Sequence, residues 1–132
     1  MLPFFRIGRN YNIEPEELFN LYIELGSLKK VVANLAGRGI VSEKTGEPFK
    51  TLVISKMIWT WIIQDYKYPY KIIKDKGYNV SEKYWEQFCV SKAYSFFVTA
   101  NHNKERYYAW IDKNKLDPKY KEYKRQKPFK DL

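Results

Sequence analysis

The sequence predicts a mainly α-helical fold: an N-terminal module of three short helices, then a C-terminal aromatic-rich helical pair and a basic tail. Three observations lead to this prediction. Apolar residues recur at helical spacing in several stretches. Pro, Gly, Ser and Asn stand where helices usually begin or end. Aromatic residues make up 18% of the 132 residues, which supplies enough apolar surface for a packed core.

The first predicted helix follows Ile13. Pro15 stands in its first turn among glutamates. Carboxylates stabilise a helix at this position, because the amino end of the helix dipole is positive. Gly26 is typical of a helix end. Between these signals, apolar residues recur at helical spacing at Leu18, Phe19, Tyr22, Ile23 and Leu25.

The second predicted helix begins directly afterwards. Ser27 is a favourable N-cap residue, and Gly37 and Gly39 end the helix. Its apolar stripe consists of Leu28, Val31, Val32 and Leu35. Residues 40–50 then combine Gly and Pro with few apolar side chains, which predicts a turn-rich loop.

Thr51 opens the third predicted helix, which runs to about Tyr66. One face is apolar and comprises Ile54, Met57, Ile58, Trp61 and Ile62. Thr51, Ser55, Lys56, Trp59 and Thr60 lie on or near the other face. A Trp on a short helix usually anchors another element, so Trp59 is expected to pack against the C-terminal aromatic helices.

The rest of the chain divides into three predicted parts. Residues 67–80 are predicted to be a connector, because Pro and Gly interrupt them, and either a short strand or a helical turn is left open at residues 70–73. Residues 81–116 form two helices, capped by Ser81 and by Asn101 or Asn103, that are expected to pack on the module of residues 1–66. Residues 117–132 have few aliphatic side chains and are predicted to be a mobile basic tail.

Positive charge is concentrated in two segments. The chain has 24 Lys and Arg against 15 Asp and Glu, a formal net charge of +9. Residues 27–80 carry ten basic and four acidic residues, and residues 113–132 carry eight and three. Clustered positive charge is typical of proteins that bind a polyanion. A basic surface that serves only solubility is the alternative.

Composition argues against most catalytic and metal sites. The single His and the single Cys, His102 and Cys89, leave a multi-histidine or Cys-rich metal site short of ligands. None of the six glycines has a phosphate-cradling spacing. We therefore expect no enzyme activity, no cofactor and no metal, with His102 structural and Cys89 a small buried apolar residue.

The same composition predicts where the protein resides. A lone cysteine fits a reducing, intracellular setting: the cytoplasm, the nucleoid, or a virion if the source is viral. No apolar stretch approaches the roughly 20 residues that a membrane helix needs. The residues after Met1 do not show the pattern of a secretory signal.

The order of residues in the first half of the chain is more specific than its composition. The series runs Gly26-Ser27-Leu28, Val31-Val32, Leu35, Gly39-Ile40, Ser42, Gly46, Phe49, Ile54 and Met57-Ile58. Over residues 14–62 it resembles the DNA-binding "recombinase" region of large serine recombinases. The catalytic domain that precedes this region in that family has no counterpart in the 132 residues. The resemblance therefore implies a helix-turn-helix that recognises DNA without cleaving it.

The resemblance also implies which side chains meet DNA. It puts Lys50, Thr51, Ser55 and Lys56 on the groove-facing side of the third helix. Phosphate contacts are expected from Lys29, Lys30, Arg38 and Lys44. In the tail, Lys121, Lys124, Arg125 and Lys127 alternate with aromatic residues and are expected to follow the backbone of a nucleic acid. An ordinary solvated surface, or a tail that docks on a protein, would show the same residues.

Three functions remain, and the first two belong to different classes. The first is a small non-enzymatic protein that binds double-stranded DNA with its third helix, as a regulator or accessory factor of a phage or mobile element. The alternative is a structural or assembly protein of a virion or packaging machine. Its basic surface would bind nucleic acid, while its aromatic helices and tail would contact a protein partner or a second copy. An RNA-binding accessory protein is a third reading.

Overall fold

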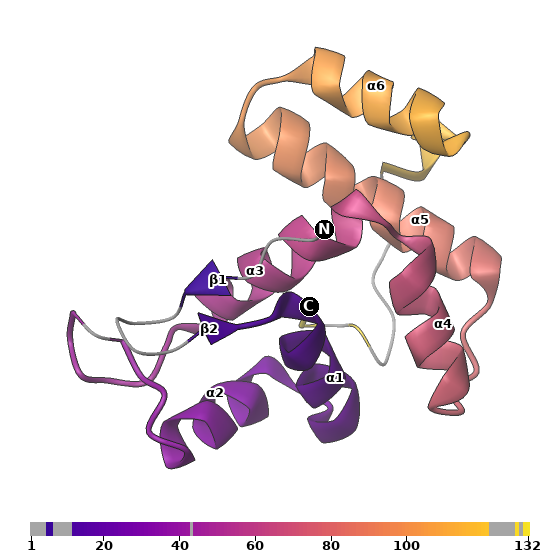
Figure 1. Ribbon diagram of the computed structural model, residues 1–132. Helices are drawn as coiled ribbons and strands as arrows, with labels where there is room; N and C mark the ends of the chain where they lie inside the picture. Colours follow the sequence, from indigo (N-terminus) through magenta and orange to yellow (C-terminus); the bar gives the residue numbers. More distant parts are fainter. Residues whose placement is uncertain (1–4, 7–11, 43, 122–128, 130) are drawn as a thin grey trace. The chain divides into compact units, whose positions relative to one another are not determined.

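A computed structural model describes residues 5–6, 12–42, 44–121, 129 and 131–132 (Figure 1). Its helices are α1 (Pro15–Leu25), α2 (Leu28–Gly37), α3 (Thr51–Gln64), α4 (Lys67–Asp75), α5 (Glu82–Tyr94), the π-helix η1 (Ser95–Ala100), α6 (Lys104–Asn114) and the 3-10 helix η2 (Pro118–Lys121). Two short strands, β1 (Phe5–Arg6) and β2 (Asn12–Ile13), pair antiparallel. The predicted mainly α-helical class is confirmed. No helix in these ranges is long and apolar enough to cross a membrane.

The chain divides into two compact units. The first comprises the residues up to Asp65 together with Lys127–Leu132, and the second comprises Tyr66–Gln126. The division after Asp65 lies within a residue of the predicted end of the N-terminal module. The sequence predicts a separate mobile tail at residues 117–132, whereas Lys127–Leu132 group with the first unit.

Local capping residues position the helices of the first unit. Gly26 adopts a left-handed conformation with φ of 84°, which L side chains disfavour, and its amide donates to the Tyr22 carbonyl at 2.8 Å. The hydroxyl of Ser27 then accepts from the Lys30 amide at 3.2 Å and caps α2. Both signals were predicted. The two helices are therefore joined by two residues, and α3 packs on both.

An apolar core fills the space between these three helices. The rings of Phe19 and Trp61 lie 5.6 Å apart. The predicted apolar face of α3 is buried: Ile54, Met57, Ile58, Trp61 and Ile62 are all at most 9% exposed. The burial of this face stabilises the unit and leaves the opposite side of α3 for other contacts.

The connection from α2 to α3, residues 38–50, is turn-rich as predicted. The Ser42 amide donates to the Glu47 carbonyl at 2.9 Å, and the Gly46 amide donates to the Ser42 carbonyl at 2.7 Å. Gly46 has φ of 71°, a value that its lack of a side chain permits. Ile40 is buried and ties the start of this connection to the core.

The second unit begins with a helix where the sequence predicts a connector. Helix α4 occupies Lys67–Asp75. Pro69 lies in its first turn, where the missing N–H is one that the helix would leave unpaired. The side chain of Ile73 is fully buried, and the Tyr70 hydroxyl donates to the Val80 carbonyl at 2.8 Å. The proline therefore starts this helix instead of interrupting it.

Aromatic side chains form the core of the second unit. The fully buried Trp85 donates its indole N–H to the Tyr66 carbonyl at 2.7 Å. Its ring meets Phe88 edge-on at 5.8 Å, and Tyr94 meets Tyr107 edge-on at 5.3 Å. The predicted caps are also present: Ser81 accepts from the Tyr84 amide at 3.0 Å, and Asn103 accepts from the Arg106 amide at 3.1 Å.

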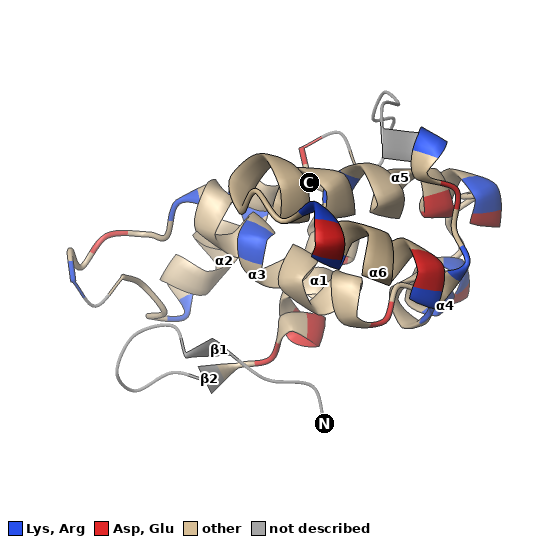
Figure 2. Ribbon diagram, turned by 90° about the horizontal axis from the view of Figure 1, so that it is seen from above, with Lys and Arg blue, Asp and Glu red and all other residues tan. Residues whose placement is uncertain are grey.

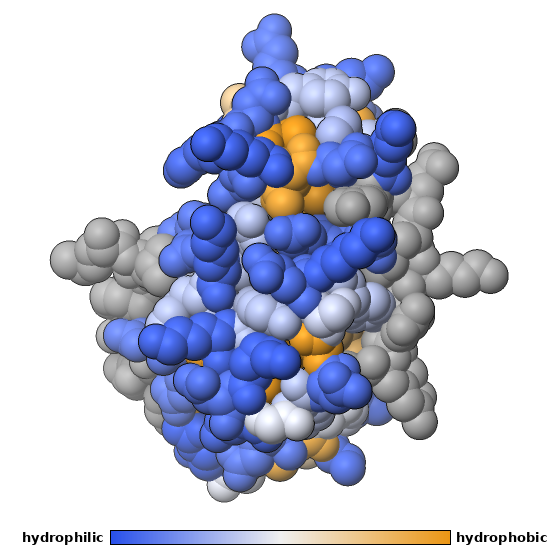
Figure 3. All heavy atoms as spheres, turned by 90° about the vertical axis from the view of Figure 1, so that its right-hand side faces the viewer, coloured by the Kyte–Doolittle hydropathy of each residue, from blue (hydrophilic) through white to orange (hydrophobic). Residues whose placement is uncertain are grey.

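Few large apolar side chains remain at the described surface. Those that do are Leu52, Val53, Tyr68 and Tyr108. In Figure 3, which shows one face of the molecule, hydrophobic atoms appear only in small areas among hydrophilic side chains. Leu52 and Val53 are adjacent in the first unit, in the first turn of α3.

Candidate nucleic-acid interface

Three of the predicted phosphate contacts are exposed on the first unit. Lys29 and Lys30 lie in the first turn of α2, and Lys44 lies in the connection between α2 and α3. Figure 2 shows the distribution of Lys and Arg along the ribbon. Within the described part of the chain, none of these three lysines forms an ion pair.

Arg38, the fourth predicted phosphate contact, has a partner. Its Nη2 donates to Oε1 of Glu17 on α1 at 3.1 Å, and the two side chains are 45% and 47% exposed. Exposed ion pairs of this kind contribute at most about 1 kcal/mol. A phosphate could therefore replace the carboxylate at small cost.

The outward face of α3 carries both cationic and apolar side chains. Lys50 stands at the N-cap position, and Lys56 follows in the second turn; both are exposed. Leu52 and Val53 are 63% and 40% exposed. Thr60 lies one turn after Lys56 on the same face. Its hydroxyl donates to the Lys56 carbonyl at 2.8 Å and is thus already hydrogen-bonded to the helix. Thr51, predicted to face the groove, is half-buried.

Ser55 has a partner that sequence analysis missed. Its hydroxyl donates to the main-chain oxygen of Leu132 at 3.1 Å, and the indole N–H of Trp59 donates to the same oxygen at 3.0 Å. The two side chains are four residues apart and so share one side of the helix. Trp59 was expected to pack on the C-terminal helices, but this hydrogen bond ties it to the end of the chain.

Phe129, Asp131 and Leu132 form a structure that we call the C-terminal clasp. Oδ1 of Asp131 accepts from the Tyr22 hydroxyl at 2.7 Å, and Oδ2 accepts from the Leu28 amide at 2.9 Å. The side chains of Phe129 and Leu132 are 0% and 1% exposed. The Asp131 carboxylate also lies at the positive end of α2, where negative charge is stabilising. At these three residues the structure differs from the predicted mobile tail.

The clasp was missed because its partners are far apart in the sequence. Asp131 and Tyr22 are 109 positions apart. No periodicity or cap signal extends over such a separation. The aromatic and aliphatic character of Phe129 and Leu132 was the available signal, and the surrounding lysines obscured it.

The predicted tail contacts are mostly not described by the structure. Lys121 is the last residue of η2. Lys124, Arg125 and Lys127 lie outside the described residues. Their proposed contact with a nucleic-acid backbone stays a prediction.

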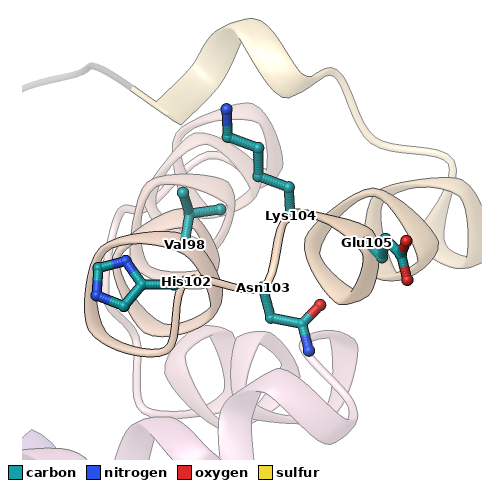
Figure 4. Close-up of a pocket in the computed structure, with 5 residues that line it drawn as sticks. All are labelled: Val98, His102, Asn103, Lys104 and Glu105. Atoms are coloured by element: carbon teal, nitrogen blue, oxygen red, sulfur yellow. The ribbon is translucent and has the colours of Figure 1, made fainter.

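A cavity of about 360 Å³ lies in the second unit (Figure 4). It is lined by Val98, His102, Asn103, Lys104 and Glu105. In Figure 4 the side chains of His102, Lys104 and Glu105 point in different directions. Catalysis needs groups that converge on a reacting atom, and these do not.

Two further features of the described residues bear on metal binding and thiol chemistry. In that part, no three His, Cys, Asp or Glu side chains are grouped as a metal site. Cys89 is 1% exposed, and burial raises the pKa of its thiol well above the ordinary value. A buried neutral thiol is a poor nucleophile, in agreement with the predicted structural role.

Comparisons of the chain with protein-family models, with curated proteins and with solved structures found no match. The resemblance to the recombinase region therefore rests on residue order alone. The charged and apolar side chains of the first unit are the features that indicate a function.

Proposed function

We propose that the protein is a non-enzymatic DNA-binding protein that reads duplex DNA with α3. The observation that carries this proposal is the outward face at the amino end of α3, where Lys50 and Lys56 are both exposed. In helix-turn-helix proteins, the first residues of the recognition helix contact the base edges. Helix α3 also contains no Asp or Glu that would repel phosphates.

The packing of the first unit supports this role. Helices α1 and α2, joined at Gly26 and Ser27, form a platform on which α3 packs. The connection of residues 38–50 is longer than the three or four residues of a simple helix-turn-helix. Because it carries Arg38 and Lys44, this longer connection adds phosphate contacts to those of Lys29 and Lys30.

The biological setting that we propose is that of a regulator or accessory factor of a phage or mobile element. It is supported by the resemblance of residues 14–62 to a recombinase reading region.

An assembly function is the second candidate, and one observation favours it. Tyr68 and Tyr108 of the second unit remain 39% and 48% exposed. Tyrosine is enriched at protein interfaces, because it combines a large apolar ring with a polar group. A virion or packaging protein would use such side chains to contact a partner or a second copy.

A salt titration with two duplexes separates these functions. The first duplex is a site selected from random DNA by the full chain, and the second is a random sequence of equal length. A DNA reader keeps its preference for the selected site as salt rises, although both affinities fall. Equal affinity for both duplexes would favour the assembly function. A preference for single strands would contradict duplex reading and favour the RNA-binding alternative.

A further inference from the structure

We propose that α3 recognises thymine in its target site through the 5-methyl group of the base, with Leu52 and Val53 as the side chains that contact it. This inference rests on the proposed DNA-binding function and adds a base preference to it. The 5-methyl of thymine is the apolar group that base pairs present in the major groove, where apolar side chains contact it.

Exposure distinguishes Leu52 and Val53 from the rest of the unit. They are 63% and 40% exposed, whereas the other large apolar residues described in the first unit are buried or half-buried. Single exposed apolar residues are common and need no explanation. Two adjacent ones in the first turn of the proposed reading helix form a small apolar surface in the position where base contacts occur.

Helical geometry joins this apolar pair to a cation. Lys56 is four residues after Leu52 and three after Val53, so the three side chains share one side of α3. A cavity of about 300 Å³ adjoins Val53 and Lys50, the N-cap residue of α3, and its other walls are Ser42, Thr45, Glu47, Pro48 and Phe49 of the preceding connection. The face thus combines apolar surface, a recess and two lysines.

Charge favours DNA over an apolar protein as the occupant of this face. The apolar pair lies between exposed Lys50 and Lys56, and α3 has no acidic residue. The major groove offers the matching pattern, with methyl groups on its floor and phosphates along both edges. A polar base contact from Ser55 is less favourable, because its hydroxyl already donates to the main-chain oxygen of Leu132.

The test removes methyl groups from DNA without changing its hydrogen bonding. Thymines of the selected duplex are replaced one at a time by deoxyuridine, and the affinity of the full chain is measured. We expect a three- to fivefold loss, about the effect of burying one methyl group, at one or two positions. The Leu52→Ala/Val53→Ala variant should bind the thymine and deoxyuridine duplexes equally at those positions.

Two controls distinguish base reading from general effects. Tyr108→Ala removes an exposed aromatic side chain from the second unit and should keep the discrimination between thymine and deoxyuridine. Lys56→Ala should weaken binding to both duplexes by the same factor, because it removes a charge. The double variant should unfold at the same urea concentration as the unchanged protein, since both replaced side chains are exposed.

The possible failures differ from one another. Duplex binding that is sequence-selective but indifferent to every deoxyuridine substitution would overturn the thymine inference and leave the proposed function standing. Absence of any duplex binding would overturn both. Unchanged thymine discrimination in the Leu52→Ala/Val53→Ala variant, together with loss of self-association, would assign the pair to a protein interface and overturn the inference.

Discussion

The carboxylate of Asp131 accepts a hydrogen bond from the Tyr22 hydroxyl at 2.7 Å, across 109 positions of sequence. Its second oxygen accepts from the amide of Leu28, the first residue of α2. The main-chain oxygen of Leu132 accepts from Ser55 and Trp59 of α3. The C-terminal clasp is thus bonded to all three helices of the first unit, including the helix that we propose to read DNA.

Replacing Asp131 tests the hydrogen bonds of the clasp. Asp131→Ala removes the carboxylate that accepts from the Tyr22 hydroxyl and from the first amide of α2, in a region where Tyr22 is buried. We expect the free energy of unfolding of the first unit to fall by about 2–4 kcal/mol. Urea denaturation followed by tryptophan fluorescence measures this loss, because Trp59 and Trp61 belong to that unit.

A double-mutant cycle provides the control for this prediction. Tyr22→Phe combined with Asp131→Ala should show a coupling energy of about 0.5–3 kcal/mol, as residues in direct contact do. Asp112→Ala, an exposed carboxylate of α6, should change stability by no more than about 0.5 kcal/mol. A neutral Asp131→Ala variant would show that the clasp does not stabilise the unit.

The buried ring of Phe129 gives a second test of the clasp. Its side chain is fully buried, so Phe129→Ala should destabilise the first unit by about 3–5 kcal/mol. The mobile tail that the sequence predicts would make the same substitution neutral. Tyr108→Ala is the control, because its ring is 48% exposed and less burial is lost than at the fully buried Phe129. Thermal and urea unfolding of the three proteins decide between these outcomes.

Tyr107 makes the second unit sensitive to alkali. Burial of its ring, followed by the nearby tyrosines and Asp117, raises its pKa from 10.0 to about 12. Because the pKa is higher in the folded state, this tyrosine stabilises the fold below pH 10 and loses that contribution as the pH rises toward about 12. Tyr107→Phe should therefore lose less stability than the unchanged protein over that interval.

The pH dependence is measured by urea denaturation at several pH values, with ultraviolet absorbance to follow tyrosine ionisation. The unchanged protein should show a late-titrating tyrosine that the Tyr107→Phe variant lacks. Identical titration curves for the two proteins would mean that burial does not shift this group.

Metal ions and nucleotides should have no specific effect on the protein. In the part of the chain that the structure describes, no three potential metal-binding side chains lie together. Zinc, magnesium and nucleotides should accordingly leave the melting temperature unchanged, since a ligand stabilises only a state that binds it. Plasmid nicking assays in the same solutions should show intact supercoiled DNA. Metal-dependent nicking would contradict the non-enzymatic proposal.

Local signals allowed much of the fold to be predicted. The junction at Gly26 and Ser27, and the caps at Ser81 and Asn103, depend on residues within four positions of one another. Such interactions are encoded directly in short stretches of sequence. The sequence left a strand and a helical turn equally open at residues 70–73, because Pro69 marks a break or a first turn equally well, and only tertiary packing of Ile73 selects helix α4.

The candidate site could be predicted only in part. Helical phase and polarity indicated that Lys29, Lys30 and Lys56 would be exposed, and they are. The same reasoning could not show that Ser55 bonds Leu132, because that contact requires the chain to return from its far end. It also passed over the outward position of Leu52, whose apolar character suggests the core and whose exposure depends on how α3 packs.

The most direct test of duplex reading by α3 compares two variants that lose the same charge. Lys50→Ala/Lys56→Ala removes two cations from the α3 face, and Lys71→Ala/Lys74→Ala removes two exposed cations from α4. Fluorescence anisotropy with the selected duplex, across a range of salt, measures both affinities. We expect the first variant to bind roughly tenfold more weakly or worse, with a salt slope reduced by about 2, and the second to bind nearly as the unchanged protein does. Equal losses in the two variants would mean that affinity follows net charge alone and would contradict reading by α3.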